Sequence, residues 1–291
     1  MISCKEYVNI QKKLLEEKIK GFERKPKLVV VQVDHDKASD SYVKGKEKDS
    51  TDIGILFEHV EIDSEKYSQE DLIAKLIELN ADENIDGIIV QLPIPDKYNV
   101  EELQKCISPD KDVDGFRPDS RFKPCTPKGI EDYLDYNNYD FVGKDVVVIG
   151  RSSIVGLPMT NALIKRGCTV TCCNSHTSKF SMINHLKRAH LIISAVGKPK
   201  FLKYSNFTSV TGGSKAEVIV DVGINRDENG KLCGDVDPTD FEKYLPNTYL
   251  TPVPGSVGLL TRCKLMENVV EAYEMHMKLN SIILQNITKS H

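Results

Sequence analysis

Tyr42 and Lys46 are two residues whose types and spacing suit proton chemistry. They lie four residues apart in a segment expected to be helical, Ala38-Ser-Asp-Ser-Tyr-Val-Lys-Gly-Lys46, so both side chains share one helix face. A lysine ammonium has a pKa of about 10.4 in water, and burial beside an apolar wall can bring it toward about 7 to 8, where it exchanges protons with a substrate. Tyr42 adds a ring face for stacking and a hydroxyl for hydrogen bonds. The alternative, favoured on this pair alone, is a surface lysine lying along the helix beside a half-buried tyrosine.

Two further polar residues follow where ligands often bind. The apolar run from Ile85 to Val90 predicts a buried strand, and the two prolines beyond it place the Gln91 amide at the carboxyl edge of that strand. In open α/β sheets this edge is where ligands bind. Asp114 lies in a loop that ends at Gly115, where it could accept hydrogen bonds from an amino-substituted ring. A turn that Asp114 merely caps is the alternative.

A glycine-bearing turn, Gly150-Arg-Ser-Ser-Ile-Val-Gly156, stands between the apolar run 146–149 and a helix expected over 157–165. This order of strand, turn and helix places backbone N–H groups and a helix N-terminus against a phosphate. Gly150 and Gly156 sit where the turn is tight or the backbone approaches a ligand. The stretch is not a Gly-x-Gly-x-x-Gly fingerprint, and a similar turn without a ligand is common in α/β proteins.

The elements that position these residues form two α/β halves. With 291 residues, 40% hydrophobic and 28% charged, the chain is expected to fold as two domains. The first half predicts a helix over 5–21, a buried strand over 27–33 and a helix that Ser39 or Asp40 caps and that runs toward Gly54.

The second half alternates strands with helical segments, which favours a mainly parallel, doubly wound sheet. Thr126-Pro127 is a good start for a helix. Further strands are expected over 168–173, 191–195 and 218–222, and a long helix over 259–284.

Composition excludes several classes of protein. The net charge of −4, without a dense basic stripe, argues against nucleic acid or an anionic membrane as a partner. No apolar stretch approaches the length that spans a bilayer, and Met1 to Lys20 is too charged for a secretory signal, so a cytoplasmic protein is expected. The eight cysteines form no C-x-x-C pair and are expected to be reduced. The seven histidines lack metal-ligand spacing, so no metal is expected.

Eight motifs follow one another along nearly the whole chain. They are Ala38-Ser39 through Tyr42 and Lys46, Val90-Gln-Leu-Pro93, Lys111-Asp-Val-Asp-Gly115, Pro124-Cys-Thr-Pro127, Gly150-Arg-Ser with Ile154-Val-Gly156, Asp221-Val-Gly-Ile-Asn225, Gly234-Asp-Val236 and Thr251-Pro-Val-Pro-Gly255. In this order they resemble the methylenetetrahydrofolate dehydrogenase/methenyltetrahydrofolate cyclohydrolase family, the bifunctional enzymes of one-carbon folate metabolism. No single motif is decisive, whereas the ordered set is very specific.

The resemblance implies an α/β fold of two domains with the folate cleft between them. A catalytic domain would span 1–120 and be completed by a C-terminal helix over 262–291, and a Rossmann-like, doubly wound NADP-binding domain would span 121–261. It implies oxidation of methylenetetrahydrofolate to methenyltetrahydrofolate with NADP, followed by hydrolysis to formyltetrahydrofolate. A homodimer is implied as well.

The resemblance also assigns roles to residues. Lys46 would manage the proton transfers, Gln91 would hold the lysine and polarise the reacting group, and the pterin would lie near Asp114 with its ring against Tyr42. The implied substrate-binding positions are Tyr42, Val90, Gln91, Leu92, Asp114, Pro254 and Gly255. The implied cofactor-binding positions are Gly150, Arg151, Ser152, Gly156, Ser175 and Ile224.

The choice of cofactor follows from the end of the second strand of the nucleotide domain. An NAD-specific site usually presents an acidic residue there, whereas this chain presents Asn174-Ser-His176. With no carboxylate to repel it, a 2′-phosphate could be held by Arg151 and Ser175, which match family positions associated with NADP. We therefore predict NADP. The alternatives are that Arg151 faces solvent without a phosphate and that His176 is a surface residue.

Three other functions are less well supported by the sequence, and chain order argues against the first of them. The Tyr42-x-x-x-Lys46 spacing also occurs in short-chain dehydrogenases, but there the pair follows the dinucleotide turn, whereas here it precedes it. A dehydrogenase that has lost the hydration step is disfavoured by the presence of Lys46 and Gln91. A non-catalytic protein that binds folate or nucleotide is not motivated by any missing group.

The chain departs from the family pattern at four places. Ser256 stands where a second glycine is usual, and Leu259 and Leu260 stand where proline and methionine are usual. The loop over 116–123 is shorter than usual, and the first strand ends at Val33-Asp34 where glycine is common. We expect the side chains near Ser256 to narrow the cleft.

Overall fold

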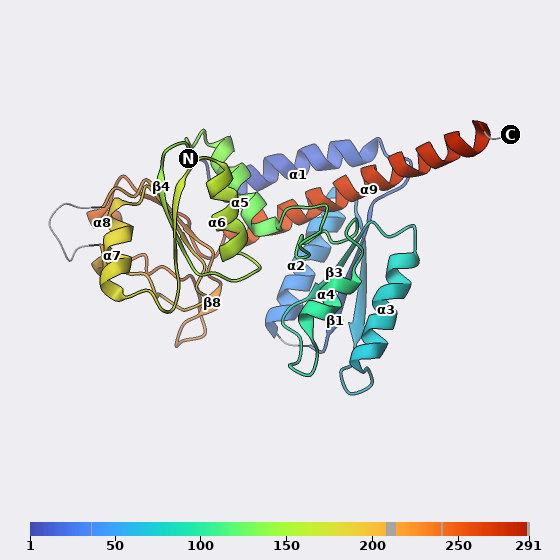
Figure 1. Cartoon of the computed structure of the whole chain (residues 1–291), viewed down its shortest axis with the longest axis horizontal. Helices are drawn as coiled ribbons and strands as arrows, with labels where there is room; N and C mark the ends of the chain where they lie inside the picture. The colour runs from blue at the N-terminus through green and yellow to red at the C-terminus, as the bar shows by residue number, and fades with distance from the viewer. Residues whose placement is uncertain (36, 208–213, 240, 290–291) are drawn as a thin grey trace. The chain divides into compact units, whose positions relative to one another are not determined.

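Two parallel sheets organise the chain, one in each of two compact units (Figure 1). The computed structural model describes residues 1–35, 37–207, 214–239 and 241–289. The N-terminal unit comprises Asn9–Cys125 and Arg262–His291, and the central unit comprises Met1–Val8 and Thr126–Thr261. Helices α1 (Cys4–Lys20) and α9 (Val257–Lys289) each contribute residues to both units.

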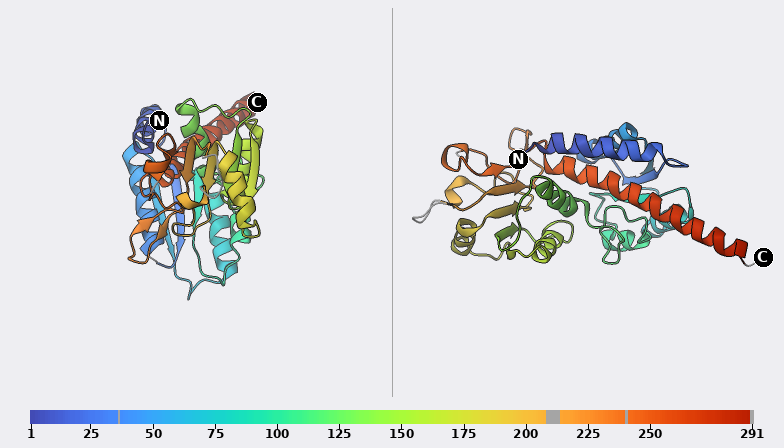
Figure 2. Two further views of the ribbon diagram at one scale, coloured as in Figure 1. Left: turned by 90° about the vertical axis from the view of Figure 1, so that its left-hand side faces the viewer. Right: turned by 90° about the horizontal axis from the view of Figure 1, so that it is seen from above.

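The N-terminal unit holds a three-stranded parallel sheet in the order β2-β1-β3. Its elements in chain order are β1 (Lys27–Val33), α2 (Lys37–Ile53), β2 (Leu56–Ile62), α3 (Gln69–Ala81), β3 (Gly87–Gln91) and α4 (Val100–Cys106). Both neighbours of β1 run parallel to it, so all three strands end at the same edge of the sheet. Within this unit α9 runs beside α1, as two views show and the Lys18–Glu274 ion pair of 2.9 Å confirms (Figures 1 and 2).

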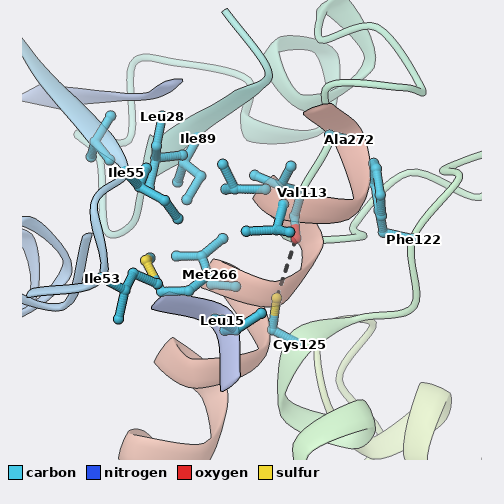
Figure 3. Close-up of a cluster of buried hydrophobic side chains, with 14 of the residues drawn as sticks. Leu15, Leu28, Ile53, Ile55, Ile89, Val113, Phe122, Cys125, Met266 and Ala272 are labelled. Carbon is cyan, nitrogen blue, oxygen red and sulfur yellow. Dashed lines mark hydrogen bonds between the residues drawn. The ribbon is translucent and has the colours of Figure 1, made fainter. Parts of the chain in front are cut away.

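Side chains of the sheet alternate between two hydrophobic clusters, as the period of a strand requires. Leu28 and Val30 of β1 pack with residues of α1, α2 and α9, while its odd-numbered valines pack with α3 and α4. Figure 3 shows the first cluster, in which the Cys125 thiol donates to the Val113 carbonyl at 3.2 Å. Ile89 belongs to that cluster, and Gln91, two residues further along β3, therefore lies on the face that α2 covers.

The central unit holds a five-stranded parallel sheet in the order β10-β7-β6-β4-β5. The strands are β4 (Asp145–Ile149), β5 (Thr169–Cys173), β6 (Leu191–Ser194), β7 (Val218–Asp221) and β10 (Tyr249–Leu250). Helices α5 (Cys125–Tyr136) and α6 (Gly156–Lys165) pack on one face, and α7 (Lys179–Arg188) and α8 (Phe241–Tyr244) on the other. The remaining elements are the 3-10 turn η1 (Tyr204–Asn206) and the hairpin β8 (Asn225–Arg226) with β9 (Leu232–Cys233). The doubly wound parallel sheet predicted from the sequence is confirmed.

The ends of several helices differ from the sequence predictions. Helix α2 begins at Lys37, so Ser39 and Asp40 lie in its first turn rather than at its cap. Asp40 instead accepts a hydrogen bond of 2.8 Å from the Gln32 amide, because that buried amide at the end of β1 needs an acceptor. Helix α5 begins at Cys125, one residue before Thr126, and α9 extends beyond 284 to Lys289. The last two residues of the expected 262–291 helix lie outside the described residues.

Asp86 holds the N-terminal unit together at the start of β3. Its side chain is fully buried and accepts hydrogen bonds from the Arg24 guanidinium at 2.6 and 2.8 Å, the Lys27 N–H at 2.9 Å and the His276 ring at 3.1 Å. Burial by itself would raise the pKa of Asp86. The hydrogen bonds from these donors together outweigh burial, so the pKa lies below the ordinary aspartate value. The carboxylate therefore contributes stability at neutral pH that is lost as the pH falls below the ordinary aspartate pKa.

No helix in the described ranges is long and apolar enough to cross a bilayer. All eight cysteines lie within the described ranges and are thiols rather than disulfides.

Arg24→Met is expected to lower the free energy of unfolding by about 3 kcal/mol, because it leaves the buried Asp86 carboxylate short of its strongest donor. Denaturant unfolding at neutral pH measures the change. Lys105→Met is the matched control, since Lys105 pairs at 2.6 Å with Glu101 on an exposed helix surface, where such pairs contribute roughly 0 to 1 kcal/mol. Equal losses in the two variants would contradict the role given to Asp86.

Candidate active site

Lys46 and Gln91 form the centre of the site in the N-terminal unit. The Lys46 Nζ donates to the Gln91 Oε1 at 2.7 Å. The amide nitrogen of Gln91 donates in turn to the Leu92 carbonyl at 2.5 Å, so the amide oxygen is left facing the lysine. Because Gln91 is only 6% exposed, its side chain is held in one orientation. The ammonium form of lysine has donors only, and this pairing fixes where its nitrogen lies.

Burial favours the neutral form of Lys46, and the charges around it act in both directions. Burial lowers the pKa of Lys46, the Asp114 carboxylate and the Cys125 thiol oppose that effect, and the Arg262 guanidinium lowers the pKa further. Burial also raises the pKa of Asp114, although Lys46 acts against this. The pKa of Tyr42 is raised by burial, so its hydroxyl stays protonated at neutral pH. The site thus combines a lysine that releases its proton easily with a partly buried carboxyl group.

The loop that carries Asp114 is held by a second, neighbouring carboxylate. Asp112 is buried and accepts hydrogen bonds from the backbone N–H groups of Phe116 at 3.4 Å and Arg117 at 2.9 Å. Gly115 has a φ of 73°, and a Cβ there would lie 2.7 Å from the Lys123 carbonyl carbon. Glycine is therefore required where the short 116–123 loop folds back on itself.

The structure brings Tyr42, Lys46, Gln91 and Asp114 into one unit, with Tyr42 and Lys46 on the same helix as predicted. Val90 points to the opposite face of the sheet, where it packs with residues of α3 and α4, so only its backbone can line the site. Leu92 is partly exposed. Pro254 and Gly255 belong to the central unit and are both exposed. The roles of these residues stay predictions.

The glycine turn of the central unit is as tight as its sequence suggests. Gly150 has a φ of 111°, and a Cβ there would overlap the Ala195 carbonyl oxygen. A Cβ at Gly156 would overlap the Gly150 carbonyl oxygen, so both glycines are required by close backbone approach. The Ser152 hydroxyl accepts from the N–H groups of Val155 at 3.2 Å and Gly156 at 3.4 Å.

Arg151 and Ser175 lie at the carboxyl ends of neighbouring strands. Ile149 of β4 is paired with Cys173 of β5, and Arg151 and Ser175 each come two residues later in the chain. Both side chains are exposed, and residues 174–178 contain no carboxylate. A turn that exposes an arginine and a serine beside a helix N-terminus fits a dinucleotide phosphate. Ile224 is 46% exposed, and its Cδ1 lies 3.3 Å from where a Cβ at Gly258 would stand.

Sequence reasoning missed a pair of carboxylates in the central unit. Asp221 accepts hydrogen bonds of 2.9 Å from the backbone N–H groups of Gly223, Asp235 and Val236. Asp235 accepts from the N–H groups of Val196 at 2.6 Å and Lys198 at 3.0 Å. Burial raises the pKa of Asp221 to about 6 although its three donors lower it.

These carboxylates explain two motifs that were assigned only by resemblance. A Cβ at Gly234 would overlap the Asp221 carboxylate, and a Cβ at Gly223 would overlap Asp235. The spacing of aspartate and glycine in Asp221-Val-Gly and Gly234-Asp was the available signal, since glycine next to a buried aspartate indicates close approach. The two motifs therefore hold the loops after β6 and β7 in place.

The departures from the family pattern are accommodated locally. Asp34 has a φ of 54°, the left-handed region that glycine favours, and its carboxylate accepts from the Ser64 N–H at 2.8 Å. The Ser256 hydroxyl is turned into the protein and donates to the Pro252 carbonyl at 2.6 Å, and Ser256 is 2% exposed. Leu260 packs against Gly129 of α5, where a Cβ would lie 3.0 Å from the Leu260 Cβ. The expected narrowing of a cleft by Ser256 stays a prediction.

Two models of one protein family match most of the chain. The model described as the tetrahydrofolate dehydrogenase/cyclohydrolase catalytic domain matches residues 2–114, and that of the NAD(P)-binding domain of the same family matches residues 124–277. A relative named bifunctional protein FolD, from Dechloromonas aromatica, is 44% identical over 262 residues, which are 86% of this chain and 87% of that protein.

Solved structures of methylenetetrahydrofolate dehydrogenase/cyclohydrolases are also similar to this chain. The bifunctional enzyme FolD-methylenetetrahydrofolate dehydrogenase/cyclohydrolase of Campylobacter jejuni superposes with a TM-score of 0.84 at 37% identity, covering 94% of this chain and 97% of that one. The Trypanosoma brucei methylenetetrahydrofolate dehydrogenase-cyclohydrolase, complexed with NADP and an inhibitor, gives a TM-score of 0.85 at 27% identity, covering 95% and 98%.

Fold and matches together define a two-domain α/β enzyme with a catalytic domain and an NAD(P)-binding domain. The chain belongs to the tetrahydrofolate dehydrogenase/cyclohydrolase family. It is a bifunctional methylenetetrahydrofolate dehydrogenase and methenyltetrahydrofolate cyclohydrolase of folate metabolism. The family, the fold class and the double activity predicted from the sequence are confirmed.

Gly234→Ala is expected to destabilise the protein by about 1 to 3 kcal/mol or more, because its Cβ displaces the buried Asp221 carboxylate from three backbone donors. Denaturant unfolding measures the loss. Cys233→Ala, at the neighbouring and partly exposed position, should change the free energy of unfolding by less than about 1 kcal/mol. Similar values for both variants would show that the loop adapts and that Asp221 does not hold it.

Proposed function

We propose that Lys46 is the proton-transfer residue of the hydration step and that Gln91 and Asp114 orient it and the substrate. The observation that carries this proposal is the 2.7 Å hydrogen bond from the Lys46 Nζ to a buried amide oxygen. In hydration, the neutral amine takes a proton from the water that adds to the methenyl carbon. It then returns that proton to the ring nitrogen as the carbon–nitrogen bond opens, and the hydroxyl proton of the adduct is released to water as the formyl C=O forms.

The substrate itself supports the neutral lysine. Methenyltetrahydrofolate is a cation, and a like charge near an ammonium lowers the pKa of that ammonium. The pterin binds near Asp114, whose carboxyl group can pair with an amino-substituted ring. Tyr42 offers its ring for stacking, and the backbone of Val90 and Leu92 completes the wall of the site. Pro254 and Gly255 are also proposed to bind the substrate.

NADP is the proposed cofactor, and when bound it accepts the hydride from the methylene carbon. The Trypanosoma brucei relative is complexed with NADP, which supports this choice. Arg151 and Ser175 hold the 2′-phosphate, since no carboxylate at 174–178 repels it. The turn residues Gly150, Ser152 and Gly156 present the backbone to the diphosphate, and Ile224 packs against the cofactor.

The remaining sequence predictions stay part of this proposal. We expect a cytoplasmic homodimer without a nucleic-acid partner. The catalytic domain is proposed to span 1–120 with 262–291, and the NADP-binding domain 121–261. A dehydrogenase-only enzyme or a binding protein would not need the partly buried Lys46–Gln91 pair, which argues against both.

Lys46→Met is expected to lower the cyclohydrolase rate by about 10²- to 10⁴-fold, the usual contribution of a general acid–base group, while some hydride transfer remains. In the wild-type protein the hydration rate should rise with pH through an apparent pKa below that of free lysine, because the neutral amine is active. Decay of methenyltetrahydrofolate, followed by its absorbance, measures the rate. Lys44→Met is the control, since Lys44 is exposed on the same helix. An unimpaired rate in Lys46→Met would refute the assignment.

Arg151→Ala is expected to weaken NADP binding by about 10- to 100-fold, the contribution of one charged hydrogen bond, and NAD binding much less. Parallel measurements of Kd for NADP and NAD test this. Lys165→Ala removes one positive charge from the opposite end of α6 and should change neither value appreciably. Equal losses for the two cofactors in Arg151→Ala would mean that another residue holds the 2′-phosphate.

A further inference from the structure

Asp49 joins three helices of the N-terminal unit next to the proposed site. Its carboxylate is 7% exposed and accepts from the Lys12 Nζ at 2.6 Å and from the Arg262 Nε at 2.5 Å. Lys12 lies on α1, Asp49 on α2 and Arg262 on α9. A buried carboxylate with two cations fixes both of them, because leaving either position costs it a charged hydrogen bond.

The Arg262 guanidinium lies against the same face of α2 that carries the site. Tyr42, Gly45, Lys46 and Asp49 are spaced by three and four residues, so they share one side of the helix. A Cβ at Gly45 would stand 3.3 Å from the Cζ and Nη1 of Arg262. The missing side chain at Gly45 therefore leaves the room in which the guanidinium lies, and Asp49 holds it there through Nε.

Arg262 adds a positive charge to a site whose other charged groups favour the ammonium form of Lys46. Of the groups that act on Lys46, the Asp114 carboxylate and the Cys125 thiol stabilise its ammonium form, and Gln91 is neutral. Arg262 acts against the ammonium, and it also favours ionisation of Tyr42, which places its charge near both side chains. It is the cation that offsets Asp114.

We propose that Arg262 is a positioning residue of the active site: its guanidinium, held against Gly45 by Asp49, sets a fixed positive charge beside Lys46 that favours the unprotonated amine. This inference rests on the proposed proton transfer by Lys46. Arg262 need not touch the substrate to act. It adds to the effect of burial in favouring the neutral amine, even in the absence of the cationic substrate.

The test is the pH dependence of the cyclohydrolase rate in Arg262→Gln and Arg262→Lys. The rising limb of the pH–rate profile reports the formation of the neutral Lys46 amine, and in Arg262→Gln this limb should move to higher pH. The rate at pH 7 should then fall by roughly threefold to tenfold, as for the loss of one partly screened charge. Arg262→Lys keeps the charge, so its limb should stay near that of the wild type. A limb unmoved in Arg262→Gln, or moved equally in both variants, overturns the proposal. A merely structural role would lower the rate at every pH without moving the limb.

A second measurement does not depend on turnover. The titration of Lys46 is followed by NMR on reductively methylated protein without ligand, with the Lys46 signal assigned from its loss in Lys46→Met. The Lys46 pKa should be higher in Arg262→Gln than in wild type. The double variant Arg262→Gln with Asp49→Asn leaves no buried carboxylate short of a donor, and it should show the same direction of change. An unchanged titration in both refutes the inference.

Lys18→Gln is the matched control, because it removes one cation from an α1–α9 ion pair that lies away from the site. It should leave both the pH profile and the Lys46 titration as in wild type. Failure of the proposed function is recognised separately. It would appear as cyclohydrolase activity retained in Lys46→Met, whereas failure of this inference leaves Lys46→Met inactive and the profile of Arg262→Gln unmoved.

Discussion

The hydrogen bond from the Lys46 Nζ to the Gln91 Oε1, at 2.7 Å, constrains much of the N-terminal unit. It needs a helix face and a strand face to meet at the carboxyl end of β3. The alternation of β3 between two hydrophobic clusters turns Ile89 and Gln91 toward α2. The parallel sheet then brings the ends of all strands to this edge, as the general rule for open α/β sheets requires. A packing arrangement thus fixes the position of the Lys46 side chain.

The proposed site of the N-terminal unit is shaped by charged and polar side chains, whereas that of the central unit is shaped by close approach of backbone segments. Gly150 and Gly156 bring two stretches of backbone closer than any Cβ would permit. The loops after β6 and β7 are held by the carboxylates of Asp221 and Asp235, each of which accepts several backbone N–H groups. Buried carboxylates are costly unless they are fully bonded, so these loops have little freedom. Such rigidity suits a site that must present backbone donors to a phosphate.

Much of the fold could be read from local patterns. The apolar run Lys27–Val33 coincides with β1. The strands expected over 168–173, 191–195 and 218–222 form within one residue of those bounds. Helix starts were less well predicted. Ser39 and Asp40 are good capping residues, but α2 begins at Lys37 because Asp40 bonds to Gln32 of the neighbouring strand. Tertiary partners therefore overrode a local capping preference.

The sequence by itself determined which residues could do the chemistry. Three features could be recognised in the sequence: the spacing of Tyr42 and Lys46, the amide at a strand end and the glycine turn. They could be recognised because helix and strand periods and turn geometry are local properties. Only the tertiary structure decided their environment. Segments that are distant in sequence produce three further features: the burial that favours neutral Lys46, the ion pair of Asp49 with Arg262, and the hydrogen bonds that Asp221 accepts from three N–H groups. Burial and charge depend on what packs against a residue, and the packing partners are not adjacent in the chain.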